Sequence, residues 1–551
     1  MLLPCCADQS EMRGSEFGQK VLTRNFRHLC FLQNPVFTIC DKSLIVAVYL
    51  TAKWSFDTKT TMATLITFVL SLLILEQAVY RTKKAHLPGA KWTIPVIGKF
   101  ADSLNPTLAN YKAQWNSGPL SVVSVFNIFI VIGSSNDMAR KILNSPNHAE
   151  PCLVASAKKI LRPDNWVFLH GKVHADYRKA LNVLFTKQAL STYLPIQESI
   201  YRRSFSQWIS DSSSATPYMM KMRDLNMETS LSVFLGPYIT ESQKKEVNEK
   251  YWLITLALEL VNFPFAFPGT KVYNAIQARK SVMKILASAS AQSKVRMEDF
   301  NNETECLLDQ WTRAMISARK AQDEGETTRL LSREYSDEEI AMVLLSFLFA
   351  SQDAMSSAIV YSFQLTADHP EVLAKIREEQ YRIRGNDLER PLSLDMVDDM
   401  VYTRAVVKEV LRYRPAVIMV PYLTTKSFPI SPDYIVPKGS MIIPAFWNSL
   451  HDETCYPEPD RFIPERWLPN ADGSAPIADS KPQNYLVWGS GPHKCIGGQY
   501  ASMHLAATLG TASVLMNWEH EKTPDSEEIK VIAAIFPKDE LRLKFTPRPP
   551  P

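Results

Sequence analysis

The sequence contains few cysteines, and none is spaced as a metal cluster requires. Its 551 residues include eight cysteines. No two of them form a C-x-x-C pair, which leaves zinc and iron–sulfur sites without their usual spacing. Few, unevenly placed cysteines in a long chain predict a reduced, cytosolic protein.

Charge of one sign and nucleotide-binding motifs are also scarce. The net charge is +4 and there is no long basic run, so we expect no nucleic acid partner. No flavin or dinucleotide motif is present, so any electrons must come from another protein. Internal repeats are absent as well. We therefore expect one large domain, although the length alone suggests about three or four.

One apolar run is long enough to span a membrane. Residues 61–80 are predicted to form a transmembrane anchor, because a spanning helix needs about 20 residues. Arg81, Lys83 and Lys84 follow at once, and the positive-inside rule then places the rest of the chain in the cytoplasm. The alternative is a cleaved signal peptide, which carries its positive charge before the apolar run.

The rest of the chain divides by composition. Residues 1–60 lack a clear periodicity, and we expect a disordered extension or a start codon assigned upstream of Met62. A basic, proline-containing linker is predicted over 81–100 and a disordered tail over 546–551. The main domain, 101–545, is predicted to be mainly α with small β-sheets (α+β).

Periodicity inside the main domain predicts particular elements. The expected helices cover 106–115, 340–365 and 499–517, within a helix-rich stretch from 135 to 414. The expected strands cover 120–126, 128–132, 417–420 and 440–444.

The strongest local signal is the loop around Cys495. Glycines and a proline on both sides permit a tight turn whose N–H groups point at the sulfur. A helix follows directly, which favours a thiolate, and a thiolate is an axial ligand of haem iron. A buried structural cysteine is the alternative. Lys494 argues against a dinucleotide loop and Trp488 against a nucleophile elbow.

Two further patterns lie upstream. Glu409 and Arg412 are three residues apart in a helical pattern and share a face, which alone is most often a surface ion pair. Ser336 and Glu339 form a capping box before a long apolar helix with polar residues in its middle, over 351–357. Those polar residues either face a polar ligand or bond back to the i−4 carbonyls.

In this order the motifs resemble the cytochrome P-450 family, over about residues 85–545. The loop resembles the haem-binding signature, with Trp488 where Phe is usual, and Glu409, Arg412 and Arg466 resemble a buried network that braces it. The resemblance implies a cytochrome P-450 fold with one N-terminal transmembrane helix, and a haem b whose iron is bound by Cys495. The cofactor-binding residues that it implies are Cys495, His493, Trp488, Gly489, Gly491, Gly497, His174 and Arg178.

The long helix resembles the oxygen-binding helix of the family, with two departures. Ser351 replaces the usual glycine, and Ala354 replaces the threonine that helps to deliver protons. The candidates left for that catalytic role are Asp353, Gln352 and Ser356.

Several segments resemble the sterol C-22 desaturases of fungi in particular, among them residues 347–353. This resemblance implies insertion of the C-22(23) double bond into a sterol side chain, in ergosterol biosynthesis. It also implies O2 as a substrate, an NADPH-cytochrome P-450 reductase with its flavin as the electron donor, and a single-pass location in the endoplasmic reticulum membrane. The substrate-facing residues that it implies are Trp166, Phe168, Phe349, Ala350, Val417, Ile418, Met419, Val420 and Phe536.

Two alternatives remain open. The same fold also supports hydroxylation or demethylation of a sterol or another lipophilic substrate. A non-catalytic haem sensor or carrier is an alternative of another class, and it would need neither the polar patch nor a sterol-sized pocket.

Overall fold

The computed structural model describes most of the chain after residue 57. The described residues are 58–99, 107–126, 128–153, 156–258, 265–324, 333–385, 387–470 and 472–548. The predicted extension lies outside them up to residue 57. The chain forms two units, Met1–Leu73 and Ile74–Pro551, which are described separately.

The described part of the first unit belongs to α3 (Thr58–Lys84), which continues into the second unit. Its apolar side chains are largely exposed, and it is long and apolar enough to cross a membrane. One other described helix meets the same measure of length and composition, α14 (Asp337–Asp368). That helix is mostly buried in protein, as expected for a core helix.

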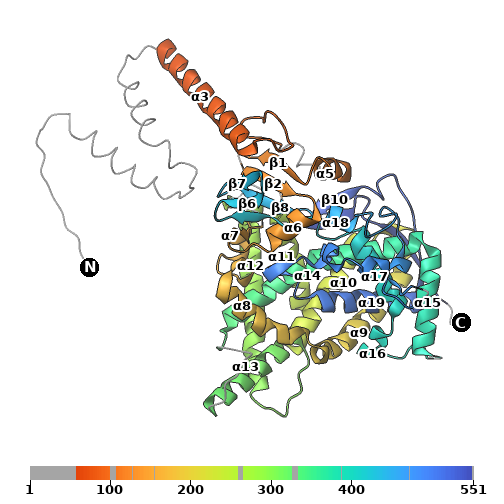
Figure 1. Cartoon of the computed structure of the whole chain (residues 1–551). Coiled ribbons are helices and arrows are strands. Elements are labelled where there is room, and N and C mark those ends of the chain that lie inside the picture. Colours follow the sequence, from red (N-terminus) through yellow and green to blue (C-terminus); the bar gives the residue numbers. More distant parts are fainter. Residues whose placement is uncertain are drawn as a thin grey trace, which may run out of the picture. The chain divides into compact units, whose positions relative to one another are not determined.

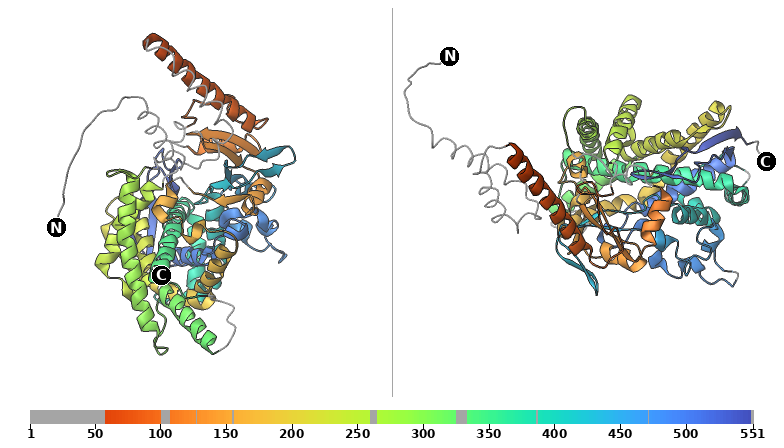
Figure 2. Two further views of the ribbon diagram at one scale, coloured as in Figure 1. Left: turned by 90° about the vertical axis from the view of Figure 1, so that its left-hand side faces the viewer. Right: turned by 90° about the horizontal axis from the view of Figure 1, so that it is seen from above.

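The second unit is mainly helical (Figures 1 and 2), which confirms the predicted fold class. Its further helices are α5 (Leu108–Trp115), α6 (Asn136–Leu143), α7 (Ala157–Leu161), α8 (Gly171–Leu181), α9 (Lys187–Asp211), α10 (Met219–Leu235), α11 (Glu241–Ala257), α12 (Lys271–Met297), α13 (Leu307–Asp323), α15 (Pro370–Arg384), α16 (Leu394–Asp398), α17 (Val401–Tyr413), α18 (Trp447–Leu450) and α19 (Gly498–Leu515).

The strands form small sheets. Five strands pair in the order β1-β2-β8-β5-β3, with β2 and β8 parallel and the other pairs antiparallel. The others form the sheet β4-β12-β9 and the hairpins β6-β7 and β10-β11. The strands are β1 (Leu120–Val125), β2 (Ile128–Gly133), β3 (Ala149–Pro151), β4 (Thr216–Pro217), β5 (Tyr422–Thr424), β6 (Phe428–Ser431), β7 (Tyr434–Val436), β8 (Met441–Pro444), β9 (Met516–His520), β10 (Ile529–Ile532), β11 (Ala534–Pro537) and β12 (Arg542–Pro547).

One predicted strand is wrong. Residues 417–420 form no strand, and β5 begins only at Tyr422. Pro415 and Pro421 flank the segment, and a proline has no N–H to donate to a sheet. The segment keeps a single bridge, from Met419 to Ala445.

The long helix α14 is central to the helical layer. The predicted capping box at its start is confirmed, because the Ser336 hydroxyl accepts from Glu339 N–H and the Glu339 carboxylate accepts from Ser336 N–H. Pro370 begins the next helix, a position that suits proline. α14 packs against α10, α12, α17, α19 and β11, and it therefore forms the wall on which side chains from many elements meet.

The segment predicted as a linker lies against the domain. Val122 N–H of β1 donates to Pro88 O at 2.8 Å, and the Tyr80 hydroxyl donates to Ala90 O at 2.9 Å. A Cβ on Gly89 would lie 2.4 Å from Val122 O, so glycine permits this close approach. At the other end, β12 runs to Pro547, into the predicted tail.

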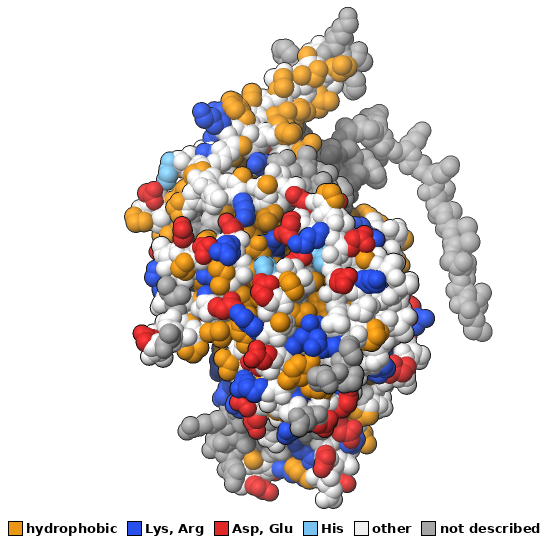
Figure 3. All heavy atoms as spheres, turned by 90° about the vertical axis from the view of Figure 1, so that its right-hand side faces the viewer, with side chains coloured by type: hydrophobic (Ala, Val, Ile, Leu, Met, Phe, Trp, Pro, Cys, Tyr) orange, Lys and Arg blue, Asp and Glu red, His pale blue; other side chains and the backbone are white. Residues whose placement is uncertain are grey.

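Acidic and basic side chains are interspersed on the face of the second unit seen in Figure 3. That face presents no large field of one sign, which agrees with the absence of a basic run in the sequence.

Candidate functional site

The loop around Cys495 is held by a backbone hydrogen bond and by a glycine at a tight contact. Cys495 N–H donates to Trp488 O at 2.8 Å. Gly491 has a φ of +72°, and a Cβ there would lie 2.3 Å from Leu143 O. Any other residue at this position would be strained by its backbone and by the contact. The loop places Cys495 shortly before the first turn of α19.

The environment of the Cys495 sulfur favours a metal-bound thiolate over a free one. The side chain keeps an exposed surface, although protein atoms crowd its other sides. Burial raises the pKa of the Cys495 thiol, while the Gly497 N–H, Arg178 and Lys494 lower it by smaller amounts. The thiol by itself therefore stays protonated at neutral pH, and a metal cation would deprotonate it on binding.

Rings and one cation gather beside the loop. The His174 ring stacks on Trp166, with centroids 5.9 Å apart and planes at 8°, and lies 4.1 Å from the His493 ring. Burial, helped by His174 and Arg178, lowers the pKa of His493 to about 4. His493 is therefore neutral at pH 7, so it offers a ring N–H but no charge.

This group lacks anionic partners among the described residues. Arg178 is half-buried, and no described carboxylate lies within ion-pair distance of it. Burial lowers its pKa, the sign of a desolvated cation. Trp166 Nε1 is buried and has no hydrogen-bond partner. Such groups are costly unless a ligand satisfies them, and the propionates of a haem would supply acceptor oxygens, so these residues fit a haem.

The structure brings the predicted network together. Glu409 and Arg412 are fully buried, and Arg412 Nε and Nη2 donate to the two Glu409 oxygens at 2.9 Å each. Arg466 Nε donates to Glu409 Oε1 at 3.1 Å. Arg412 also donates to the carbonyls of Leu450 and Pro459. The network therefore ties α17 to the chain that leads to the cysteine loop.

Sequence reasoning missed a fourth member, Trp467. Its Nε1–H donates to Glu409 Oε2 at 2.9 Å, and its ring lies 5.1 Å from that of Tyr485. The Tyr485 hydroxyl donates to Lys408 O at 3.2 Å. Tyr485 directly precedes η8 (Leu486–Trp488), the start of the loop. The available signal was that Trp467 follows Arg466 in the sequence.

The three proposed catalytic side chains are buried, and each is held by a partner within the protein. Asp353 is almost fully buried in an ion pair with Arg223 of α10. Gln352 Nε2 donates to Arg223 O at 2.8 Å, and the Ser356 hydroxyl bonds back to Gln352 O at 2.5 Å. The pKa of Asp353 is raised by burial, against the effect of Arg223 and Thr255. Arg223 had no local signal, because 130 residues separate it from Asp353.

The predicted substrate residues differ in exposure. Ala350 and Val417 are exposed, and Phe349, Met419 and Val420 are intermediate. Four of the nine are buried: Trp166, Phe168, Ile418 and Phe536. Phe536 lies 5.9 Å from the Arg223 guanidinium, so it packs beside the ion pair. The buried side chains pack behind the surface that would face a substrate, and the exposed ones can contact a ligand directly.

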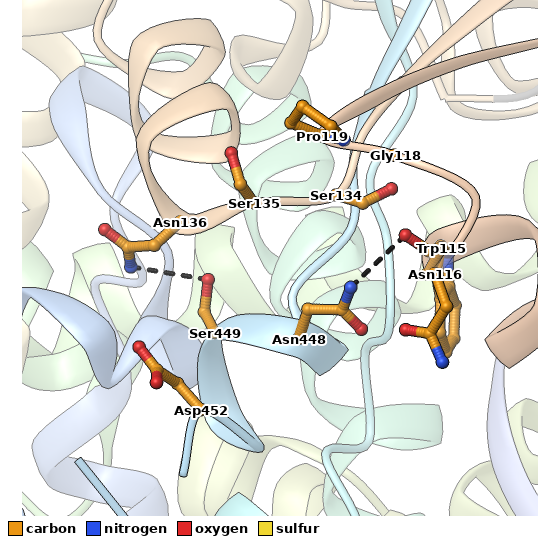
Figure 4. Close-up of a pocket in the computed structure, with 10 residues that line it drawn as sticks. All are labelled: Trp115, Asn116, Gly118, Pro119, Ser134, Ser135, Asn136, Asn448, Ser449 and Asp452. Carbon is orange, nitrogen blue, oxygen red and sulfur yellow. Dashed lines mark hydrogen bonds between the residues drawn. The ribbon is translucent and has the colours of Figure 1, made fainter. Parts of the chain in front are cut away.

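One surface pocket is separate from the cysteine loop. It has a volume of about 620 Å³ and is lined mainly by neutral amides and hydroxyls from α6, α18 and the turn before β1 (Figure 4). Asn136 reaches Ser449 across it, and Asn448 reaches Trp115 O. A second pocket of about 320 Å³ borders Arg223 and Gln352. Neither pocket is lined by Cys495 or its neighbours.

Comparison with known proteins decides the family. The family model described as cytochrome P-450 matches residues 88–545. The chain belongs to the cytochrome P-450 family. The predicted resemblance is therefore confirmed, and with it the haem-thiolate iron that the family carries.

Curated relatives of this P-450 include desaturases. It is 45% identical to the C-22 sterol desaturase erg5 of Aspergillus fumigatus, over 86% of this chain and 92% of that protein. It is also 45% identical to the C-22 sterol desaturase ERG5 of Candida albicans, over 89% of this chain and 93% of that one. The cytochrome P450 monooxygenase oblE of Emericella variicolor is 38% identical, over 94% of this chain and all of that one.

A solved structure shares the fold. The retinoic acid bound cyanobacterial CYP120A1 superposes with a TM-score of 0.71 at 20% identity, over 84% of this chain and 99% of that one. At this identity the likeness speaks for the fold alone.

Proposed function

We propose that this P-450 introduces the C-22(23) double bond into the side chain of a sterol, as in ergosterol biosynthesis. The observation that carries the proposal is the 45% identity to C-22 sterol desaturases over nearly the whole chain. The apolar character of the exposed positions Ala350 and Val417 suits a sterol.

Each part of the site has a proposed task. When bound, the haem supplies the activation of O2. Cys495 would hold the iron, while His493, His174 and Arg178 would hold the propionates. Trp488 and the glycines of the loop set the position of the sulfur. Glu409, Arg412 and Arg466 keep the loop in place, because their charge-assisted bonds have fixed geometry.

The remaining residues orient the substrate and exclude water. The apolar positions of α14 and of residues 417–420 would hold C-22 and C-23 close to the place where O2 is activated. About 1 Å of misplacement there matters strongly. Asp353 would deliver protons only if it leaves Arg223, because the ion pair occupies its carboxylate. Gln352 would do so only by leaving Arg223 O and Asn226. Ser356 would act only by leaving Gln352 O.

Electrons are proposed to come from an NADPH-cytochrome P-450 reductase through its flavins, with the exposed Lys494 on the docking face. We also propose a single-pass anchor in the endoplasmic reticulum membrane, with the second unit in the cytoplasm. The support is the exposed apolar surface of α3 and the three basic residues in its last turn.

The test is the product mass from the purified protein with reductase, NADPH and a sterol saturated at C-22. Loss of two hydrogen atoms supports the desaturase. Gain of one oxygen without an alkene would keep the P-450 assignment and move the function to hydroxylation. Haem that binds without any NADPH-dependent consumption of O2 would favour the sensor or carrier.

A further inference from the structure

The contact between α9 and α19 buries a tyrosine and a histidine that the proposed function does not use. Tyr201 and His504 are almost inaccessible to solvent, and Tyr201 Oη lies 3.0 Å from His504 Nδ1. The other ring nitrogen, His504 Nε2, has no hydrogen-bond partner among the described residues. Among the tyrosines that the structure describes, Tyr201 is the one whose hydroxyl bonds to an imidazole.

The His504 ring is suited to take a proton from Tyr201. Burial lowers the pKa of His504 to about 3, so the ring is neutral at pH 7. With its hydrogen on Nε2, a neutral imidazole offers Nδ1 as an acceptor, and a hydrogen bond of this length permits direct proton transfer. A phenol that has lost an electron is a much stronger acid than an imidazolium. Its proton therefore passes to Nδ1, although His504 resists protonation by water.

Aromatic rings connect this pair with the cysteine loop. Tyr500, in the first turn of α19, lies 6.1 Å from the His504 ring and 6.5 Å from the Phe185 ring. Phe185 lies 4.0 Å from the place that a Cβ on Gly497 would take. Because a helix rises about 1.5 Å per residue, about 10 Å separates Gly497 from His504. The pair is therefore close enough to the loop for an electron to tunnel between them.

A second series of rings leads away from the loop along α9. The Tyr201 ring lies 6.1 Å from that of Phe205, and Phe205 lies 5.3 Å from Trp208. Trp208 is in the last turns of α9 and is 5% exposed. Its indole, like the phenol of Tyr201, can be oxidised by one electron. Tyr201 therefore lies between the cysteine loop and a ring that reaches the surface.

We propose that Tyr201 gives one electron to the haem at Cys495 when O2 has been activated there without a substrate, and that His504 takes its proton. The O–H bond of Tyr201 breaks and an N–H bond forms on His504. The haem is reduced by one electron, and Tyr201 becomes a neutral phenoxyl radical. A thiolate in solution returns the electron through Trp208 and becomes a thiyl radical, while the proton returns from His504. The pair thereby protects the haem from its own oxidant.

The test is electron paramagnetic resonance of the haem-loaded wild type, mixed with a peroxyacid in the absence of sterol. We expect the signal of a phenoxyl radical, which changes when the tyrosine rings are deuterated. In protein whose histidine nitrogen is isotope-labelled, we expect the radical to couple to that nitrogen, as its hydrogen bond requires. A wild type that forms no tyrosine radical, or a radical without coupling to histidine, would overturn the inference.

Two variants remove one partner each. Y201F lacks the hydroxyl, and H504N replaces the imidazole by an amide that cannot take the proton. Because a positioned base contributes about 10²–10⁴-fold to proton transfer, we expect each variant to lower the radical yield at least about tenfold. We also expect the haem of Y201F to bleach faster when NADPH and reductase are supplied without sterol.

The matched control is Y193F. Tyr193 is a buried tyrosine of the same helix, and its ring lies 6.3 Å from that of Tyr500. Its hydroxyl donates to Leu184 O at 3.1 Å, and a carbonyl cannot take the proton. Y193F should keep the full radical yield. A wild-type yield in Y201F or H504N, or an equal loss in Y193F, would contradict the assignment to Tyr201.

The inference needs haem at Cys495 and does not depend on which sterol product forms. If the wild type makes an alcohol, the desaturase is refuted, but the radical still reports on Tyr201. If the alkene forms and Y201F keeps the radical, the desaturase stands and Tyr201 is excluded.

Discussion

The buried carboxylate of Glu409 offers the most direct test of how the fold holds the cysteine loop. Its two oxygens accept five N–H donors, from Arg412 (two), Arg466, Trp467 and the Ile463 backbone, and it is fully buried. In E409Q the shape stays, but two guanidinium groups lose their counter-charge. Removing one partner of a buried ion pair costs about 3–5 kcal/mol, so we expect E409Q to unfold more easily by about that amount. We also expect it to lose haem.

The assay is denaturant unfolding together with haem content per folded molecule, from the absorption spectrum. The matched control is E198Q. Glu198 is also a buried carboxylate, which accepts from Arg202, Arg384 and Leu392 N–H, and none of its described hydrogen bonds or ion pairs reaches α17. E198Q should lose stability and keep haem in its folded fraction. Full haem and wild-type stability in E409Q, or equal haem loss in E198Q, would refute the reasoning.

Three further outcomes are expected. G491A should abolish haem binding, because its Cβ would meet Leu143 O. Gly489 has open space at its Cβ position, so G489A should lose only about 1–3 kcal/mol of stability from its positive-φ backbone. Equal haem content in both variants would argue against the loop geometry. A354T should change the alkene-to-alcohol ratio of the product, and an unchanged ratio would remove this position from the mechanism. Burial lowers the pKa of His504 to about 3, whereas in the unfolded chain the same imidazole has a pKa of about 6.5. As pH drops below about 6.5, His504 is therefore protonated in the unfolded chain first, and the folded protein loses stability. Between pH 7 and pH 5, His504 should lower the free energy of unfolding by about 2 kcal/mol. H504N should lack this loss, and a pH dependence of stability identical to that of the wild type would count against the role of His504.

Local sequence determined the elements and the order of the motifs. The capping box at Ser336 and Glu339 set where α14 begins, because a cap involves only residues three apart. The glycines around Cys495 specified a tight loop before a helix, and the spacing of Glu409 and Arg412 put both on one face. These features depend on neighbours in the chain, and they could be inferred without knowing what packs against them.

Tertiary packing decided where the polar side chains of α14 point. Asp353 pairs with Arg223 of α10, and Ser351 is the one polar side chain between residues 347 and 357 that keeps exposed surface. This arrangement arises because α10 lies beside α14. Ile418 and Phe536 are apolar like Val417, yet the core buries them and leaves Val417 exposed. Periodicity says that a residue is apolar or polar, whereas its partner depends on helices far away in the sequence. Only the folded chain brings such distant partners together, and so only the structure could assign them.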